Sequence, residues 1–392
     1  MPTAMPLICT TLLLALAHPG HALTATHGSR FAAGLQQQQL EGREPGGQPW
    51  GERLAEQLAP ALTDMIFEVN WTHISHTGEN YCAKGKLVPE FYVLGAKNAG
   101  TTSLAHDLMH LGVMATPRNM DKEWNLFKAR ADDPGLEDRF FASLPWCPSE
   151  QTVLGDFSAT TLFAVPMPSD LTWSRDYGCP AKHTDNVGAW DAARLIHQLH
   201  ATAGDRKPRL VVLLRDPLSR MQSEYYHTKP KFNCLGCMAN ATFAESLAFS
   251  ADLLQHHPPE VTDWIWKSMY ARHIENFLQY FDATQFMFVP SQEYYKLNPQ
   301  AFSQSLLSWL GLHGEPWREA SHDNQHLDRP PLESELPLDS PARLAFERAI
   351  APENRRLVRV LAGAQRAGAR MVGYAGEPGD EEQLRAWLEG AW

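Results

Sequence analysis

Short apolar runs alternate along this chain with longer stretches whose apolar residues recur every three or four positions. Continuous apolar runs cover residues 91–94 and 210–214, and shorter extended stretches cover 152–157, 285–289 and the residues that end near Met114. Runs of this length are typical of strands buried on both faces of a parallel sheet. We therefore predict a strand at each of these positions.

The stretches with helical spacing follow the predicted strands. Further helices are expected to begin at Lys122, Ser158 and Pro217, and Pro352 is expected to break the last helix. Repeated strand–helix units favour an α/β fold, a P-loop-like parallel β-sheet with helices on both faces. The helical spacing itself predicts helices over residues 104–111, 138–144, 189–203, 243–256, 264–281, 300–310 and 341–362.

The two ends of the chain differ from the middle. An apolar stretch over residues 7–17 predicts a signal peptide or a short membrane anchor within residues 1–25. Residues 26–88 include a run of glutamines and a segment rich in glycine and proline, which is typical of a partly disordered stem. We expect the folded domain to cover residues 89–372, followed by a C-terminal tail over residues 373–392.

Composition narrows the class of protein. Of the 392 residues, 44% are hydrophobic and 20% are charged, as in globular proteins. The formal net charge of −11 argues against a partner that is nucleic acid, although it allows a local basic pocket. Sequons at Asn70 and Asn240 support a glycoprotein of the secretory pathway. We expect a lumenal protein that is soluble after signal cleavage or held by a short anchor.

Six cysteines are present, and Cys9 lies in the predicted signal peptide. The other five allow at most two disulfides, whose pairing the sequence leaves open. Cys234 and Cys237 have the spacing of half a zinc site, but the chain has no second pair of this kind. In an oxidising lumen a disulfide is therefore the favoured interpretation, and we predict no metal site.

The strand over residues 91–94 leads into Gly95-Ala-Lys97-Asn-Ala-Gly100-Thr-Thr-Ser-Leu104. A glycine loop between a strand and a helix points backbone N–H groups and the helix dipole at one place, which suits a phosphate or a sulfate. The glycine spacing is that of a phosphate loop, but a nucleotide triphosphatase has its lysine directly after the second glycine. Here Thr101 occupies that position, and the alternative is an ordinary glycine turn.

A second polar segment, residues 215–223, follows the strand over residues 210–214. Arg215 stands at the carboxyl end of that strand, the edge where open α/β sheets bind ligands. Ser223 comes about two helical turns later, and Arg220 stands one turn before it. Arginine with a serine hydroxyl suits a phosphate monoester, whereas a surface arginine paired with Asp216 is the alternative for either arginine alone.

These residues carry a family resemblance. Residues 95–104 resemble the 5′-phosphosulfate loop of the sulfotransferases, and residues 214–227 resemble their 3′-phosphate element. The similarity is greatest to Golgi carbohydrate sulfotransferases of the heparan-sulfate type, and it covers about residues 90–361. It implies the sulfotransferase fold and transfer of a sulfuryl group from 3′-phosphoadenosine 5′-phosphosulfate (PAPS) to an acceptor hydroxyl on a carbohydrate in the Golgi lumen, without a metal.

The resemblance also implies a role for each matching residue. Lys97 would stabilise charge on the leaving phosphate. Glu123, in a segment similar to the family's Lys-Glu-x-x-Phe-Phe run, would deprotonate the acceptor hydroxyl; a solvated helix start is the alternative for this segment. The cofactor-binding residues would be Lys97, Asn98, Ala99, Gly100, Thr101, Thr102, Ser103, Arg215 and Ser223.

The chain departs from the family pattern in several places, and one of them is Ser268, which stands where the family has a glycine before a tyrosine. Asp156-Phe-Ser158 stands where the family often has a segment containing an active-site lysine. The late disulfide and the loop that closes over the cofactor have no clear counterpart, and Arg329, His322 and His326 are the candidates to replace that loop. Other hypotheses are a sulfotransferase for a small alcohol or phenol, a P-loop kinase, and a non-catalytic nucleotide-binding module.

Overall fold

The computed structural model describes residues 75–76, 79–115, 123–124, 127, 135–165, 191–204, 206–228, 241–256, 263–321 and 329–390. The chain divides into two units, Met1–Asn70 and Trp71–Trp392, and all of these residues belong to the second. The predicted signal peptide, most of the predicted stem, both sequon asparagines, and Cys179, Cys234 and Cys237 lie outside the described residues.

A six-stranded sheet in the order β10-β8-β7-β4-β6-β5 forms the centre of the second unit, and its neighbouring strands are all parallel. The central strands β4 and β7 are almost entirely inaccessible to solvent, as their continuous apolar sequences predict. The strands are β4 (Phe91–Gly95), β5 (Met114–Ala115), β6 (Leu154–Asp156), β7 (Arg209–Leu214), β8 (Phe286–Pro290) and β10 (Arg370–Met371).

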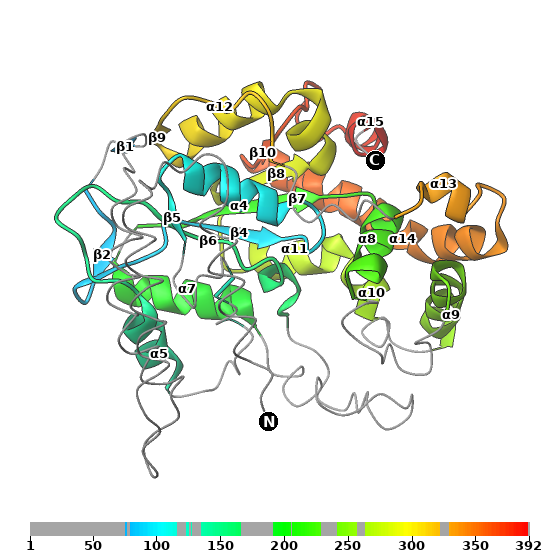
Figure 1. Cartoon of the computed structure of the whole chain (residues 1–392), viewed down its shortest axis with the longest axis horizontal. Coiled ribbons are helices and arrows are strands. Elements are labelled where there is room, and N and C mark those ends of the chain that lie inside the picture. The colour runs from blue at the N-terminus through cyan, green and yellow to red at the C-terminus, as the bar shows by residue number, and fades with distance from the viewer. Residues whose placement is uncertain are drawn as a thin grey trace, which may run out of the picture. The chain divides into compact units, whose positions relative to one another are not determined.

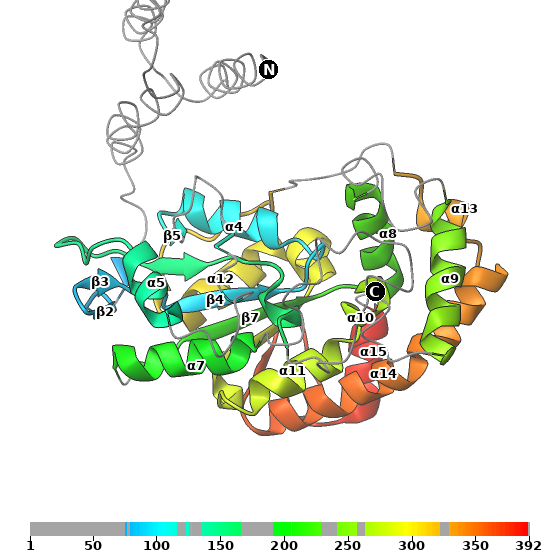
Figure 2. The same ribbon diagram turned by 90° about the horizontal axis from the view of Figure 1, so that it is seen from below.

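Helices cover both faces of this sheet (Figures 1 and 2). Helices α4 (Thr101–His110) and α12 (Pro299–Leu310) lie on one face, and α7 (Ala192–Ala203) and α11 (Tyr270–Leu278) lie on the other. The predicted α/β fold, a parallel sheet between two layers of helices, is confirmed. The other helices are α5 (Leu136–Ser143), α8 (Pro217–Thr228), α9 (Phe243–His256), α10 (Asp263–Trp266), α13 (Leu332–Glu335), α14 (Pro341–Arg366) and α15 (Glu381–Gly390), with single-turn helices at Thr161–Phe163, Ala283–Gln285 and Glu293–Leu297.

Two small antiparallel sheets accompany the central one. They pair β1 (Ser75–His76) with β9 (Leu312–His313), and β2 (Cys82–Ala83) with β3 (Lys86–Leu87). A disulfide joins Cys82 to Cys147. Tyr81 and Leu87 belong to the hydrophobic core, although the sequence analysis assigned residues 26–88 to the stem. At the other end, Leu384 and Leu388 of α15 also join the core, so this part of the predicted tail packs on the domain.

The predicted helix over residues 264–281 is wrong as a single helix. It is two helices, α10 and α11, separated by a turn at Lys267 and Ser268. The apolar spacing continues across the turn because Trp266, Met269 and Tyr270 are all buried. Spacing alone therefore did not reveal the break.

The predicted break at Pro352 is also wrong, because α14 runs through this proline from Pro341 to Arg366. A proline inside a helix costs about 3 kcal/mol or more. The helix buries Phe346 and Ile350 on one side of the proline and Leu357 and Leu361 on the other, each contributing about 1.5–3 kcal/mol. Burial on both sides of Pro352 exceeds the cost of the proline, so the helix continues.

Glu123 and Trp124 do not form the helix predicted to begin at Lys122, a residue outside the described part of the chain. The helix expected at Ser158 is a single turn at Thr161–Phe163. Within the residues that the structure describes, no helix combines the length and the apolar character needed to cross a membrane.

Candidate functional site

The loop between β4 and α4 is built by two residues with left-handed backbone conformations, Asn98 (φ 66°) and Gly100 (φ 104°). A Cβ atom on Gly100 would lie 2.6 Å from the Tyr295 hydroxyl oxygen, so a larger residue would collide with this ring. Tyr295 in turn donates a hydrogen bond of 3.1 Å from its hydroxyl to Ser103 Oγ. The second glycine of the motif therefore allows both the turn and the close approach of Tyr295.

Helix α4 begins directly after this loop, at Thr101. The first backbone N–H groups of a helix have no acceptor inside the helix, and they form the positive end of its dipole. Gly100 supplies no side-chain cap, and the first turn contains no acidic residue. The N–H groups of Thr101, Thr102 and Ser103 therefore provide a positive end that is suited to an anion.

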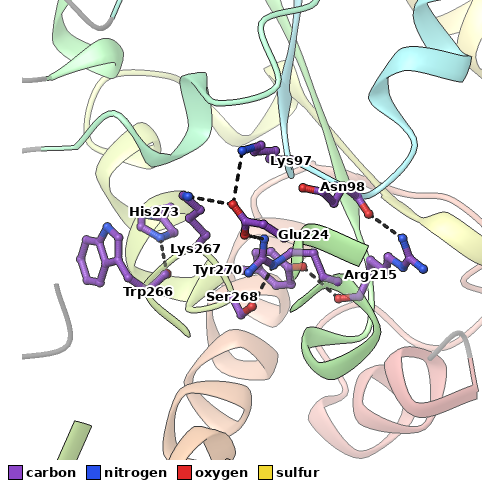
Figure 3. Close-up of polar contacts among 10 residues, drawn as sticks. Lys97, Asn98, Arg215, Glu224, Trp266, Lys267, Ser268, Tyr270 and His273 are labelled. Carbon is purple, nitrogen blue, oxygen red and sulfur yellow. Dashed lines mark hydrogen bonds and ion pairs between the residues drawn. The ribbon is translucent and has the colours of Figure 1, made fainter. Parts of the chain in front are cut away.

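Arg215 follows β7, the strand next to β4 in the sheet. Its Nη1 donates a hydrogen bond of 2.7 Å to the backbone oxygen of Asn98 (Figure 3), which joins the two predicted anion-binding segments. Burial and the nearby charge of Arg329 lower the pKa of Arg215 to about 10, so its guanidinium remains charged at neutral pH. The two segments thus meet at the carboxyl ends of adjacent parallel strands, where open α/β sheets bind ligands.

Arg329 was one of three candidates for the missing cofactor-closing loop. It lies close enough to Arg215 for its charge to lower the pKa of that arginine. The other two candidates, His322 and His326, lie outside the described residues. Ser223 lies in α8 and is largely buried. Its role in phosphate binding stays a prediction.

Ser291 connects three elements at the same edge of the sheet. Its hydroxyl lies 2.8 Å from the backbone oxygen of Ala99 and 3.0 Å from that of Leu214, within hydrogen-bond distance of both. Ser291 follows β8 directly, so it links the β4–α4 loop, the end of β7 and the end of β8. The sequence analysis missed this residue, because a single serine after a strand has no distinguishing pattern.

Lys97 belongs to a cluster of charged residues that the sequence analysis also missed. Its Nζ donates to Glu224 Oε1 at 3.3 Å, and Nζ of Lys267 donates to the same oxygen at 2.8 Å (Figure 3). The second oxygen, Oε2, accepts a hydrogen bond of 2.7 Å from Nη1 of Arg220. Arg220 also donates from Nε to Ser268 Oγ at 2.8 Å. This Glu224 cluster comprises Lys97, Arg220, Glu224 and Lys267.

Glu224 is almost completely buried, which by itself raises the pKa of a carboxyl group. The charges of Lys267, Arg220 and Lys97 outweigh this effect and hold its pKa far below the usual range. Glu224 is therefore ionised at any physiological pH. The spacing of Arg220 and Glu224 along α8, four residues apart, was a visible signal of this pair. Nothing in the sequence connected Lys267 with them.

Arg220 has a different environment from the one expected. The sequence analysis placed it beside Ser223 in an element suited to phosphate, but its side chain is 0% exposed. Arg220 binds Glu224 within α8, and its bond to Ser268 holds α8 against the turn between α10 and α11.

The segment around Glu123 is attached to the sheet by aromatic side chains. The ring of Phe127 packs edge-on against Tyr92 of β4, and the ring of Trp124 stacks on Phe140 of α5. Glu123 itself is partly buried. Its predicted role as the catalytic base stays a prediction.

Asp156 and Ser158 stand at the end of β6, where the family pattern has a lysine. Both are fully buried, and the backbone N–H of Ser158 donates a hydrogen bond of 3.0 Å to Asp156 Oδ1. Within the described part of the chain, no three or more His, Cys, Asp or Glu residues come together in a way that could hold a metal ion. The absence of a metal from the reaction remains a prediction.

Comparison with known proteins finds similarity to solved structures. No protein-family model matches the chain, and no curated protein matches it. Among solved structures, the crystal structure of a sulfotransferase from Alicyclobacillus acidocaldarius is similar, with a TM-score of 0.40 and 18% sequence identity. The match covers 67% of this chain and 96% of that one. A likeness at this level says nothing about the activity of this chain.

Proposed function

We propose that this protein is a sulfotransferase that moves the sulfuryl group of PAPS to an acceptor hydroxyl. The observation that carries the proposal is the meeting of two anion-binding segments, the β4–α4 loop and the end of β7, through the 2.7 Å hydrogen bond between Arg215 and Asn98. A donor with phosphate at both the 3′ and 5′ positions requires two such sites. A simple nucleoside triphosphate has all its phosphates in one chain and does not.

The residues fit the donor in two parts. Thr101, Thr102 and Ser103, with Asn98, Ala99 and Gly100 shaping the loop, would hold the 5′-phosphate through backbone N–H groups. Arg215 and Ser223 would hold the 3′-phosphate, and Arg329 supports this assignment because its positive charge acts on Arg215. Lys97 would lie at the bridging oxygen between phosphate and sulfur.

In the transfer step, the bond between sulfur and the bridging oxygen breaks, and the bridging oxygen keeps the electron pair on the 5′-phosphate. A new bond forms between sulfur and the acceptor oxygen. The proton of the acceptor hydroxyl passes to the carboxylate of Glu123. Lys97 stabilises the negative charge that develops on the bridging oxygen, and the fixed loop supplies positioning and charge stabilisation.

We propose a carbohydrate as the acceptor and the Golgi lumen as the location. The resemblance of the motifs to carbohydrate sulfotransferases supports the first proposal. The apolar N-terminal stretch, the sequons and the disulfide between Cys82 and Cys147 support the second. A screen of sulfated glycans, unsulfated glycans and small alcohols with labelled PAPS identifies the acceptor class.

Substitution of Lys97 tests the mechanism. Lys97→Ala is expected to reduce sulfate transfer by about 100- to 1000-fold, the usual effect of removing one donor that stabilises a developing oxyanion. Lys207→Ala is the matched control, since Lys207 lies far from the loop in the sequence and forms an exposed ion pair with Asp282. Unchanged transfer by Lys97→Ala would contradict the mechanism, and magnesium-dependent ATP turnover by the wild-type protein would favour a kinase instead.

Glu123→Gln tests the base. It is expected to lose the transfer step while it still binds 3′-phosphoadenosine 5′-phosphate (PAP), the spent donor, because the amide cannot take the acceptor proton. Calorimetry measures PAP binding, and labelled PAPS measures transfer. Transfer at the wild-type rate would remove Glu123 from the reaction but leave the role of Lys97 intact.

A further inference from the structure

Lys267 and Lys97 come from different elements and bind one carboxylate oxygen. Lys97 lies in the β4–α4 loop, whereas Lys267 lies in the turn that separates α10 from α11. Their Nζ atoms are 3.3 Å and 2.8 Å from Glu224 Oε1, so the two ammonium groups are close neighbours. Such a pair of like charges raises the free energy of the folded state unless anions balance it.

The four residues of the Glu224 cluster carry three positive charges and one negative charge. Its two lysines are also the part that reaches solvent. The side chains of Lys97 and Lys267 are 27% and 16% exposed, whereas those of Arg220 and Glu224 are 0% and 1% exposed. An anion that approaches the cluster therefore meets the two ammonium groups, with Glu224 behind them.

The two lysines are also separate from the arginine subsite. Figure 3 shows the ends of Lys97 and Lys267 converging on Glu224, while the guanidinium of Arg215 lies on the other side of Asn98. If Arg215 holds the 3′-phosphate, the lysine pair faces the other end of the same donor. That end carries the sulfuryl group.

We infer that Lys267 is a second direct ligand of the sulfuryl group, paired with Lys97, and that Glu224 is the positioning residue that holds the two ammonium groups beside each other. The inference rests on the proposed function. Oxygens of the sulfuryl group accept hydrogen bonds from both lysines. Because the ammonium groups that donate these bonds are charged, the bonds are stronger than hydrogen bonds between neutral groups. The turn that interrupts the predicted helix thus brings a cation into the site.

The test compares PAPS with PAP, which lacks the sulfuryl group, by calorimetry on the full chain. Lys267→Met is expected to weaken PAPS binding by about 10-fold or more, the size of one charge-assisted hydrogen bond, while PAP binding changes by less than about 3-fold. Lys207→Met is the matched control and is expected to change neither affinity. An equal loss for both ligands, or no loss for PAPS, would overturn the inference.

A second variant separates a ligand from a structural counter-ion. If Lys267 only neutralises Glu224, the double variant Lys267→Met/Glu224→Gln regains the wild-type preference for PAPS over PAP. If Lys267 binds the sulfuryl group, the double variant stays as poor as Lys267→Met. Thermal unfolding of each variant confirms that it is folded. Failure of the wild-type protein to bind either PAPS or PAP would overturn the proposed function, whereas normal binding with an unchanged Lys267→Met variant would overturn this inference alone.

Discussion

Arg215 combines a structural contact with a charge at the edge of the sheet. One of its nitrogen atoms donates to the backbone of the β4–α4 loop, and its planar guanidinium has further N–H donors. Its position directly after a buried parallel strand is what made it recognisable in the sequence. Its bond to Asn98 depends on the pairing of β4 with β7, which no local pattern contains.

The proposed role of Arg215 in holding a 3′-phosphate leads to a prediction about ligand choice. Arg215→Met is expected to weaken PAP binding by about 10- to 100-fold, because a charge-assisted pair is lost, and to weaken binding of adenosine 5′-phosphosulfate, which has no 3′-phosphate, much less. Arg209→Met at the opposite end of β7 is the control. Equal losses for the two ligands in Arg215→Met would show that the substitution disturbs the loop rather than a 3′-phosphate subsite.

At the scale of elements, the Glu224 cluster holds together three segments: the β4–α4 loop, helix α8 and the turn between α10 and α11. The sequence predicted the loop and α8 correctly but missed the turn. Periodicity reports which side chains are buried, and both sides of this turn bury apolar residues. At the break, Lys267 and Ser268 contact Glu224 and Arg220 of α8, which only the packed structure reveals.

Removal of the carboxylate from the Glu224 cluster is expected to cost more stability than removal of an exposed one. Glu224→Ala leaves three cations without their shared counter-ion, and we expect it to lower the free energy of unfolding by about 3–5 kcal/mol. Glu137→Ala, which removes the partner of exposed Lys84, is expected to lower it by less than about 1 kcal/mol. Denaturant unfolding of the two variants compares them, and equal losses would show that the cluster is not a stabilising unit.

At the scale of the whole molecule, His200 links distant parts of the chain. Its Nδ1 lies 3.0 Å from the Tyr81 hydroxyl, and its Nε2 lies 2.9 Å from the Tyr92 hydroxyl of β4. Burial and, after it, the nearby charge of His197 lower the pKa of His200 to about 3. A histidine in an unfolded chain has a pKa of about 6.5. Between this pKa and the lower pKa of His200, the folded protein therefore keeps the imidazole neutral, whereas the unfolded chain binds a proton.

This difference in proton binding predicts a loss of stability in acid. Between about pH 6.5 and pH 3 the unfolded state binds one more proton at His200 than the folded state, so the free energy of unfolding falls as pH falls, by up to about 1.4 kcal/mol per pH unit. His200→Gln is expected to reduce this slope. His256→Gln, at an exposed histidine, is expected to leave it unchanged. Equal slopes in wild type and His200→Gln would contradict the prediction.

The sequence by itself determined the class of fold and the two segments that we predict to bind anions. Both depend on local patterns: apolar runs typical of buried strands, glycines that allow a left-handed turn, and charged residues directly after a strand. The tertiary structure decided how these segments are completed. Ser291, Glu224 and Lys267 reach the site through pairing and packing between segments far apart in the chain. The single lysine predicted for the loop is, in the folded protein, one of two that share a buried carboxylate.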